Sequence, residues 1–264
     1  MANSLRSVEQ LRSRFDEIYD SCVIGGGFFE SDQYYKAEKE RYWRSLELFC
    51  RLNVAAPVRI LEIGGGQLAL LCKLLFGDDC TVADISDKYV SPLQKAGLKL
   101  AKLNLMYPEA STIDGEFDVV VLLEVIEHIP VPGYVVMERI KPFLKPAGIV
   151  FLTTRNLFRI RNLIRMFLGR EFLDRFMVPE PGQGLGHQLE YSADHLRWQL
   201  ERAGMQVVML EHDSLGRTGH SVKARLARTL LAPLELRAIW RDGLVAAARK
   251  SSVASGSNSN PQIG

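Results

Sequence analysis

The segment Val58–Leu68 reads VRILEIGGGQL, and the rest of the chain can be arranged around it. It begins with an apolar, β-branched run and breaks at three consecutive glycines. A leucine-rich stretch with helical spacing continues to Leu75. This order predicts a buried parallel strand, a tight turn and a helix. Glycines at such a turn let the backbone approach a ligand closely, and the helix N-terminus offers its N–H groups to an anion or a carboxylate.

A second strand is predicted about twenty residues further on, where the sequence TVADIS carries Asp84 near its end. An acidic residue in this place can accept hydrogen bonds from both hydroxyls of a ribose. Two kinds of ligand site fit the pattern, one for a dinucleotide and one for S-adenosylmethionine. A purely structural strand–helix turn is the third interpretation.

Length and composition indicate one α/β domain with attachments: 264 residues, 47% hydrophobic and 24% charged. No run of eighteen apolar residues occurs, so no transmembrane helix is expected. The first residues, MANSLRSVEQLRSRF, lack the apolar region of a secretory signal. The four cysteines have no CxxC spacing, which is typical of free thiols in a reducing cytoplasm. The expected location is therefore the cytoplasm, with attachment to a membrane surface left open.

Charge is spread unevenly along the chain. Residues 1–150 hold 17 Lys and Arg against 21 Asp and Glu, a net charge of −4. Residues 151–264 hold 16 against 10, a net charge of +6. The basic C-terminal part indicates a partner that carries phosphate or lies at a membrane, or else simply a solvated face.

The N-terminal part, residues 1–56, is predicted to form a helical cap. Charged and aromatic residues follow helical spacing from Asp32 to Leu52, and Asp32 is a suitable N-cap. Residues 57–250 alternate strand and helix patterns, which predicts a doubly wound, mostly parallel sheet. Ligands bind at the carboxyl ends of the strands in such a sheet. Four residues stand at predicted strand ends: Gly64, Asp84, Asn104 and Glu124.

Beyond the fifth predicted strand, residues 156–178 form an amphipathic helical insertion. The arginines of this region are Arg155, Arg159, Arg161, Arg165, Arg170 and Arg175. The Arg-rich helix over 155–176 favours peripheral contact with a membrane, or an acceptor that bears phosphate. The alternative is a lid whose apolar face packs on the sheet. A second basic, apolar helix is predicted for Val222–Trp240, broken at Pro233, and residues 251–264 are predicted to be a disordered tail.

Three longer motifs indicate a family. They are EVIEHIP at 124–130, LKPAGIVFLTTRN at 144–156 and YSADHLRWQLERAGMQVV at 191–208. Together with the glycine-rich turn they resemble the class I S-adenosylmethionine-dependent methyltransferases over roughly residues 40–212. Leu68 and Ala147 stand where that family usually has glycine. The resemblance implies a Rossmann-like, seven-stranded sheet whose final antiparallel strand is GLVAAARK, residues 243–250.

The same resemblance implies which residues bind the cofactor S-adenosylmethionine. Glu62, Gly64 and Gly66 would contact its methionine and ribose end, and Asp84 its ribose hydroxyls. Ile85 would pack on the adenine. The adenine edge would meet Asn104 and Leu105, and the methionine part Leu123 and Glu124.

Glu124, Glu127 and His128 form an ExxEH motif after the fourth predicted strand, and His187 follows about sixty residues later. Two carboxylates and two imidazoles suit a divalent ion such as Mg²⁺. The arrangement resembles the ubiquinone-pathway O-methyltransferases and the small-RNA 2′-O-methyltransferases. A metal would orient acceptor hydroxyls and lower their pKa. Two alternatives stay open: His128 or His187 acts as a base without a metal, or neither group takes part in proton transfer.

The leading prediction is an S-adenosylmethionine-dependent O-methyltransferase with a small-molecule acceptor, such as a sugar, a quinone-like ring or a lipid-linked intermediate. A metal-dependent RNA 2′-O-methyltransferase is one alternative. The sequence shows no recognisable RNA-binding module and is only slightly basic overall, which argues against nucleic acid. The other alternative is a regulator that binds the nucleotide cofactor without turnover.

Overall fold

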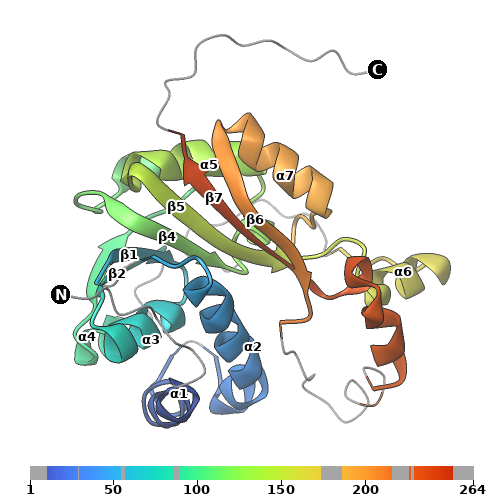
Figure 1. Ribbon diagram of the computed structural model, residues 1–264, viewed down its shortest axis with the longest axis horizontal. Helices are drawn as coiled ribbons and strands as arrows, with labels where there is room; N and C mark the ends of the chain where they lie inside the picture. Colours follow the sequence, from blue (N-terminus) through green and yellow to red (C-terminus); the bar gives the residue numbers. More distant parts are fainter. Residues whose placement is uncertain are drawn as a thin grey trace.

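A computed structural model describes residues 11–28, 30–54, 57–85, 90–173, 186–215, 226 and 229–251 (Figure 1). Five sequence predictions lie partly or wholly outside these residues. They are the predicted N-terminal cap at residues 1–10, 29 and 55–56, the predicted insertion at residues 174–178 with Arg175, the loop that follows residue 177, most of the first half of the predicted helix Val222–Trp240, and the tail beyond residue 251.

A seven-stranded sheet with the order β3-β2-β1-β4-β5-β7-β6 forms the centre of the molecule. Strands β1 to β5 pair in parallel, and β7 pairs antiparallel with both β5 and β6. The strands are β1 Arg59–Ile63, β2 Asp79–Asp84, β3 Lys99–Lys102, β4 Phe117–Leu123, β5 Leu144–Arg155, β6 Met205–Asp213 and β7 Gly243–Lys250. The predicted doubly wound, mostly parallel sheet and its antiparallel last strand are confirmed.

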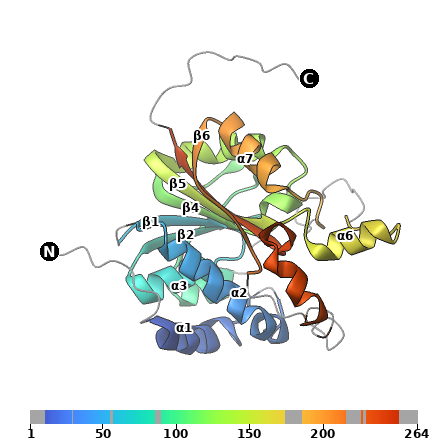
Figure 2. The same cartoon turned by 45° about the vertical axis from the view of Figure 1, so that its right-hand side comes forward.

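Helices cover both faces of the sheet (Figures 1 and 2). The α-helices are α1 Arg12–Ile18, α2 Asp32–Cys50, α3 Gln67–Phe76, α4 Val90–Lys95, α5 Gly133–Ile140, α6 Ile160–Phe167 and α7 Ala193–Arg202. Short π- and 3₁₀-segments are η2 Tyr19–Val23, η3 Pro108–Ala110, η4 Ile126–His128, η5 Lys141–Phe143, η6 Ala232–Leu236 and η7 Ala238–Trp240. In Figure 1, α1, α2 and α3 lie on one side of the sheet, and α5 and α7 lie on the other.

The sheet divides the hydrophobic core into two clusters, because alternate residues of a strand point to opposite faces. On β4, Val119 and Val121 pack with the first cluster, and Val120 and Leu122 pack with the second. All four are fully buried, as the near-continuous apolar run of a central parallel strand requires. The core therefore fixes the carboxyl end of β4, where the ExxEH motif begins.

Helix α2 differs from its prediction at both ends. Its N-cap is Ser31, not Asp32, because the Ser31 hydroxyl accepts a hydrogen bond from the Tyr34 backbone N–H at 3.2 Å. Asp32 instead accepts a bond from the backbone N–H of Gly25 at 2.7 Å. The helix ends at Cys50 rather than at Leu52.

The predicted helix lengths in the C-terminal part are also wrong. Among the described residues of the insertion, 156–173, only α6 is helical, and Gly169, with φ of 63°, follows its end in the left-handed conformation that terminates helices. In the described part of Val222–Trp240, two 3₁₀ segments replace the end of the predicted helix. Pro233 stands at the start of η6, where its missing N–H is tolerated. Among the described residues, no helix combines the length and apolar character needed to cross a bilayer.

Candidate functional site

The three glycines after β1 form a tight turn with positive φ at each residue: 82° at Gly64, 74° at Gly65 and 91° at Gly66. A Cβ at Gly66 would lie 2.9 Å from the Leu93 side chain and 3.0 Å from Val82. Position 66 therefore excludes other residues by conformation and by space. Leu68, in the place of the family's usual third glycine, is fully buried under the turn.

Glu62 lies beneath this turn at the end of β1 and is almost completely buried. Its carboxylate accepts a hydrogen bond from the backbone N–H of Ala69, in the first turn of α3. Burial raises the pKa of Glu62 to about 7, although backbone hydrogen bonds from Ala69, Leu68 and Gly66 lower it. The side chain thus holds the glycine turn against the N-terminus of α3.

The predicted adenosine contacts gather at the ends of β2 and β3. Asp84 is the last residue of β2, and its carbonyl accepts a hydrogen bond from the backbone N–H of Leu103 at 3.2 Å. Ile85 exposes about half of its surface, 49%, which is unusual for isoleucine and leaves it available for stacking. The Asn104 side-chain oxygen accepts a bond from Met106 N–H, and Leu105 is buried.

Glu124 follows Leu123 at the end of β4 with φ of 56°, a left-handed backbone that glutamate rarely adopts. Its backbone N–H donates to the Thr153 carbonyl at 3.0 Å, which keeps the residue registered with β5. One carboxylate oxygen lies 4.0 Å from Arg155 Nε. The structure thus turns the chain sharply at the point where the methionine end of a cofactor is predicted.

Arg41 of α2 interacts electrostatically with Glu124, and the sequence analysis did not single it out. It is buried, its Nε lies 2.7 Å from a Glu38 oxygen, and it donates a hydrogen bond to the Tyr34 hydroxyl at 3.0 Å. Burial lowers the pKa of Arg41, but Tyr42 first, then Tyr34, Glu38 and Glu124, more than offset this and raise it. An arginine inside a charged helix gives no sequence signal for such a position.

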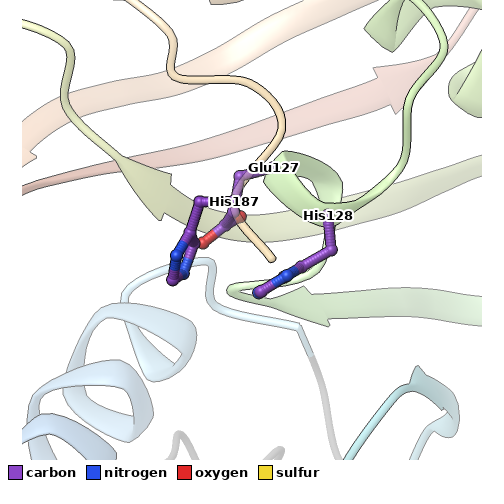
Figure 3. Close-up of side chains that lie close together, drawn as sticks. All are labelled: Glu127, His128 and His187. Atoms are coloured by element: carbon purple, nitrogen blue, oxygen red, sulfur yellow. The ribbon is translucent and has the colours of Figure 1, made fainter. Parts of the chain in front are cut away.

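The predicted metal ligands Glu127, His128 and His187 lie close together, although about sixty residues of the chain separate His187 from the other two. One ligand atom from each lies within 4.8 Å of the others, and the centroids of the two imidazole rings are 4.5 Å apart. Figure 3 shows the three side chains converging, with the Glu127 carboxylate next to the His187 ring. Glu124 is outside this three-residue group, so its part in a four-ligand set stays a prediction.

Glu127 is completely buried. Its Oε2 accepts a hydrogen bond from the Thr154 hydroxyl at 2.9 Å, and its Oε1 has no hydrogen-bond partner among the described residues. Burial, and next the charge of Glu124, raise the pKa of Glu127 above its ordinary value. A buried carboxylate oxygen without a donor, close to two imidazoles, is suited to a cation.

The segment that carries His187 is held from two sides. The Glu127 carbonyl accepts hydrogen bonds from the backbone N–H groups of Gln188 at 2.9 Å and Leu189 at 3.0 Å. Further along, Glu190 accepts bonds from Arg159 and from Asn162 of α6, and all three side chains are buried. This network could not be predicted from the sequence, because its members are distant in the chain and lack a motif.

A glycine-rich turn after β1, an acidic residue ending β2 and the strand order with antiparallel β7 define a class of protein. A family profile described as "Methyltransferase domain" matches residues 35–210, so the chain belongs to that family. It is an enzyme of the class I S-adenosylmethionine-dependent methyltransferases, as predicted.

Two curated relatives have a more specific name. The chain is 32% identical over 118 residues to "Ubiquinone biosynthesis O-methyltransferase" of Albidiferax ferrireducens, covering 42% of this chain and 46% of the relative. It is 30% identical over 139 residues to the protein of the same name from Thiobacillus denitrificans, covering 46% and 56%. The chain thus spans about half the length of the curated relatives it matches.

Solved structures share the fold at low identity. An S-adenosylmethionine-dependent methyltransferase from Mesorhizobium loti superposes with a TM-score of 0.52 at 15% identity, covering 79% of this chain and 97% of the other. Phosphoethanolamine N-methyltransferase 2 of Haemonchus contortus, solved with S-adenosyl-L-methionine, gives 0.53 at 16% identity, covering 90% and 60%.

Proposed function

We propose that this methyltransferase moves a methyl group from S-adenosylmethionine to a hydroxyl oxygen of a small molecule, with help from a divalent cation. The observation that carries the proposal is the convergence of Glu127, His128 and His187 beside the end of β4. Methyl transfer is an in-line displacement, so the protein must align the acceptor with the sulfonium methyl group. It must also remove the hydroxyl proton.

The cofactor lies, in this proposal, along the carboxyl ends of β1, β2, β3 and β4. Asp84 would bind the ribose hydroxyls and Ile85 would cover the adenine, beside Asn104 and Leu105. Gly64 and Gly66 admit the backbone close to the ligand, Glu62 shapes the turn from behind, and Leu123 and Glu124 meet the methionine part. The buried guanidinium of Arg41 places positive charge near Glu124, where it suits the methionine carboxylate.

Glu127, His128 and His187 would hold the cation, because their nitrogen and oxygen donors suit a divalent ion. Such an ion would lower the pKa of an acceptor hydroxyl, so that the proton passes to solvent, and would fix the orientation of the acceptor. Thr154 holds one oxygen of Glu127, which leaves the other oxygen for the cation. The hydrogen bonds from Gln188 and Leu189 to the Glu127 carbonyl keep the His187 segment in register with it.

The acceptor is a hydroxyl on a quinone-related aromatic ring, and a ring with two neighbouring hydroxyls is the first compound to test. The names of the relatives support this class. Chemistry supports it too, because a cation held at this site would lower the pKa of a ring hydroxyl and help to orient a ring that carries two of them.

The test uses the full chain with S-adenosylmethionine, Mg²⁺ and a catechol, and measures S-adenosylhomocysteine formation. Glu127→Gln and His187→Ala should each lower the rate by about a hundredfold or more, and native mass spectrometry should show loss of the bound ion. His195→Ala, at a histidine of α7 outside the group, is the matched control and should keep full activity.

Full activity in the presence of a strong chelator would reject the cation and leave a histidine as the base. Binding of S-adenosylmethionine with no turnover on hydroxylated acceptors would reject O-methylation.

A further inference from the structure

Helix α6 shows the reverse of the usual amphipathic arrangement. Its buried residue is polar: Asn162, which together with the N-cap Arg159 reaches Glu190. Ile160 and Leu163 are half-buried, but its other apolar residues face outward, and Phe167 is 90% exposed. Other exposed apolar side chains on and around the helix are Phe158, Ile164, Met166 and Leu168. A lid that packs its apolar face on the sheet, one of the two sequence interpretations, does not fit this orientation.

A second exposed apolar segment lies next to α6. It contains η6 and η7, and its exposed apolar side chains are Leu226, Leu230, Leu234, Leu236 and Ile239, with Leu236 at 83%. The Asn156 side chain joins the two segments, since its Nδ2 donates to the carbonyls of Ile239 at 2.7 Å and Arg241 at 2.8 Å. Figures 1 and 2 both show the two segments leaving the same end of the sheet.

These two sets of side chains are called the apolar face from here on. Ten large apolar side chains exposed at one end of a protein exceed the scattered exposure normal for a soluble surface. The face therefore marks a site of contact with another phase or molecule.

The charge near the apolar face indicates which kind of partner binds there. Residues 155–170 contain five arginines and no Asp or Glu, and Arg161 and Arg170 among them are exposed. The described residues 229–241 contain two arginines against one Glu. A second copy of the chain would bring like charges together across the contact. A bilayer with anionic headgroups accepts apolar side chains into its interface and pairs with the arginines at the same time.

We infer that the apolar face docks on an anionic lipid bilayer, with α6 and the η6–η7 segment inserting together. This adds a second element to the helix that the sequence suggested. The docked face adjoins the active site, because Arg159 and Asn162 bind Glu190, three residues after His187. An apolar acceptor dissolved in the bilayer would then reach the enzyme from the side of its metal-ligand segment.

The test is sedimentation of the full chain with vesicles of neutral phosphatidylcholine, alone or mixed with phosphatidylglycerol. The chain should bind the mixed vesicles and stay in solution with the neutral ones, and added salt should weaken binding. Phe167→Ser and Leu236→Ser should each weaken partitioning about tenfold, since each removes one inserted side chain. Both residues are largely exposed, so circular dichroism should show folded variants.

Tyr107→Ser is the matched control, because Tyr107 is exposed but follows β3 at the opposite edge of the sheet. Failure to bind anionic vesicles would overturn the inference. So would a wild-type level of binding by Leu236→Ser, which would remove the second element. Concentration-dependent dimers that either serine variant abolishes would assign the face to a second copy. Vesicle binding and methyl transfer are measured separately, so either can fail without the other.

Discussion

Helices α3 and α6 are both rich in apolar residues, yet one buries them and the other exposes them. In α3, Leu68, Ala69, Leu70 and Leu71 are all buried, because the helix packs on the sheet and also against α1 and α2. In α6 the buried residue is Asn162, and Phe167 lies in solvent. An apolar stripe therefore identifies a surface that must leave water, but the fold alone decides whether the protein core or a partner covers it.

The largest change in the free energy of unfolding is expected when Leu→Ala is made in α3 and compared with the same substitution at the end of α6. Leu71→Ala should reduce the free energy of unfolding by about 4 kcal/mol, because Leu71 is completely buried and its loss leaves a cavity. Leu168→Ala, at the exposed end of α6, should change it by less than about 0.5 kcal/mol. Urea denaturation of both variants measures the difference. Similar losses at both positions would show that α6 is packed in solution as α3 is.

Removing the buried ion pair that attaches α6 should lower the free energy of unfolding by nearly as much. Glu190→Ala leaves the Arg159 guanidinium buried without its partner and should cost about 3 kcal/mol. Glu201→Ala removes the exposed pair with Arg197 on α7 and should cost about 0.5 kcal/mol or less. Equal effects of the two variants in thermal unfolding would contradict a buried network beneath α6.

The next effect is on the pH dependence of stability, through Glu62 beneath the turn at the start of α3. The folded pKa of Glu62, about 7, is above its ordinary value of 4.5, so the folded state holds this proton more tightly. Stability from Glu62 is therefore complete below pH 4.5 and is lost as the pH rises through about 7. The loss is about 3 kcal/mol at most. Glu62→Gln should flatten this part of the curve of unfolding free energy against pH, and an unchanged slope would refute it.

The smallest effect is expected at the helix N-termini. Ser31 and Ser192 cap α2 and α7 through their hydroxyls, whereas Arg159, the N-cap residue of α6, makes no side-chain cap bond. Ser31→Ala should lower the unfolding free energy by about 1 kcal/mol. Ser31→Asp, which keeps an acceptor, should restore most of it; equal losses in both would assign the effect to something other than capping.

The sequence predicted the parts of the fold that depend on neighbouring residues. The strand, turn and helix around Gly64–Gly66 are local, and so is the alternation that produced the sheet. The convergence of His187 with His128 could be expected only through resemblance to known enzymes. The roles of its neighbours depend on tertiary contacts between distant segments, as with Arg41 and Glu190. Periodicity also overestimated the length of the helix after β5, because an amphipathic pattern does not show at which residue a helix ends.

The order of the sheet has a consequence for synthesis of the chain. In the described sheet β6 is an edge strand whose neighbour is β7, and β7 begins thirty residues after β6 ends, at Gly243. As the chain emerges from the ribosome, β1 to β5 can pair in turn, but β6 must wait for β7 to separate it from β5. Until then its backbone donors and acceptors are unmatched, so a stalled chain would present a strand prone to join another.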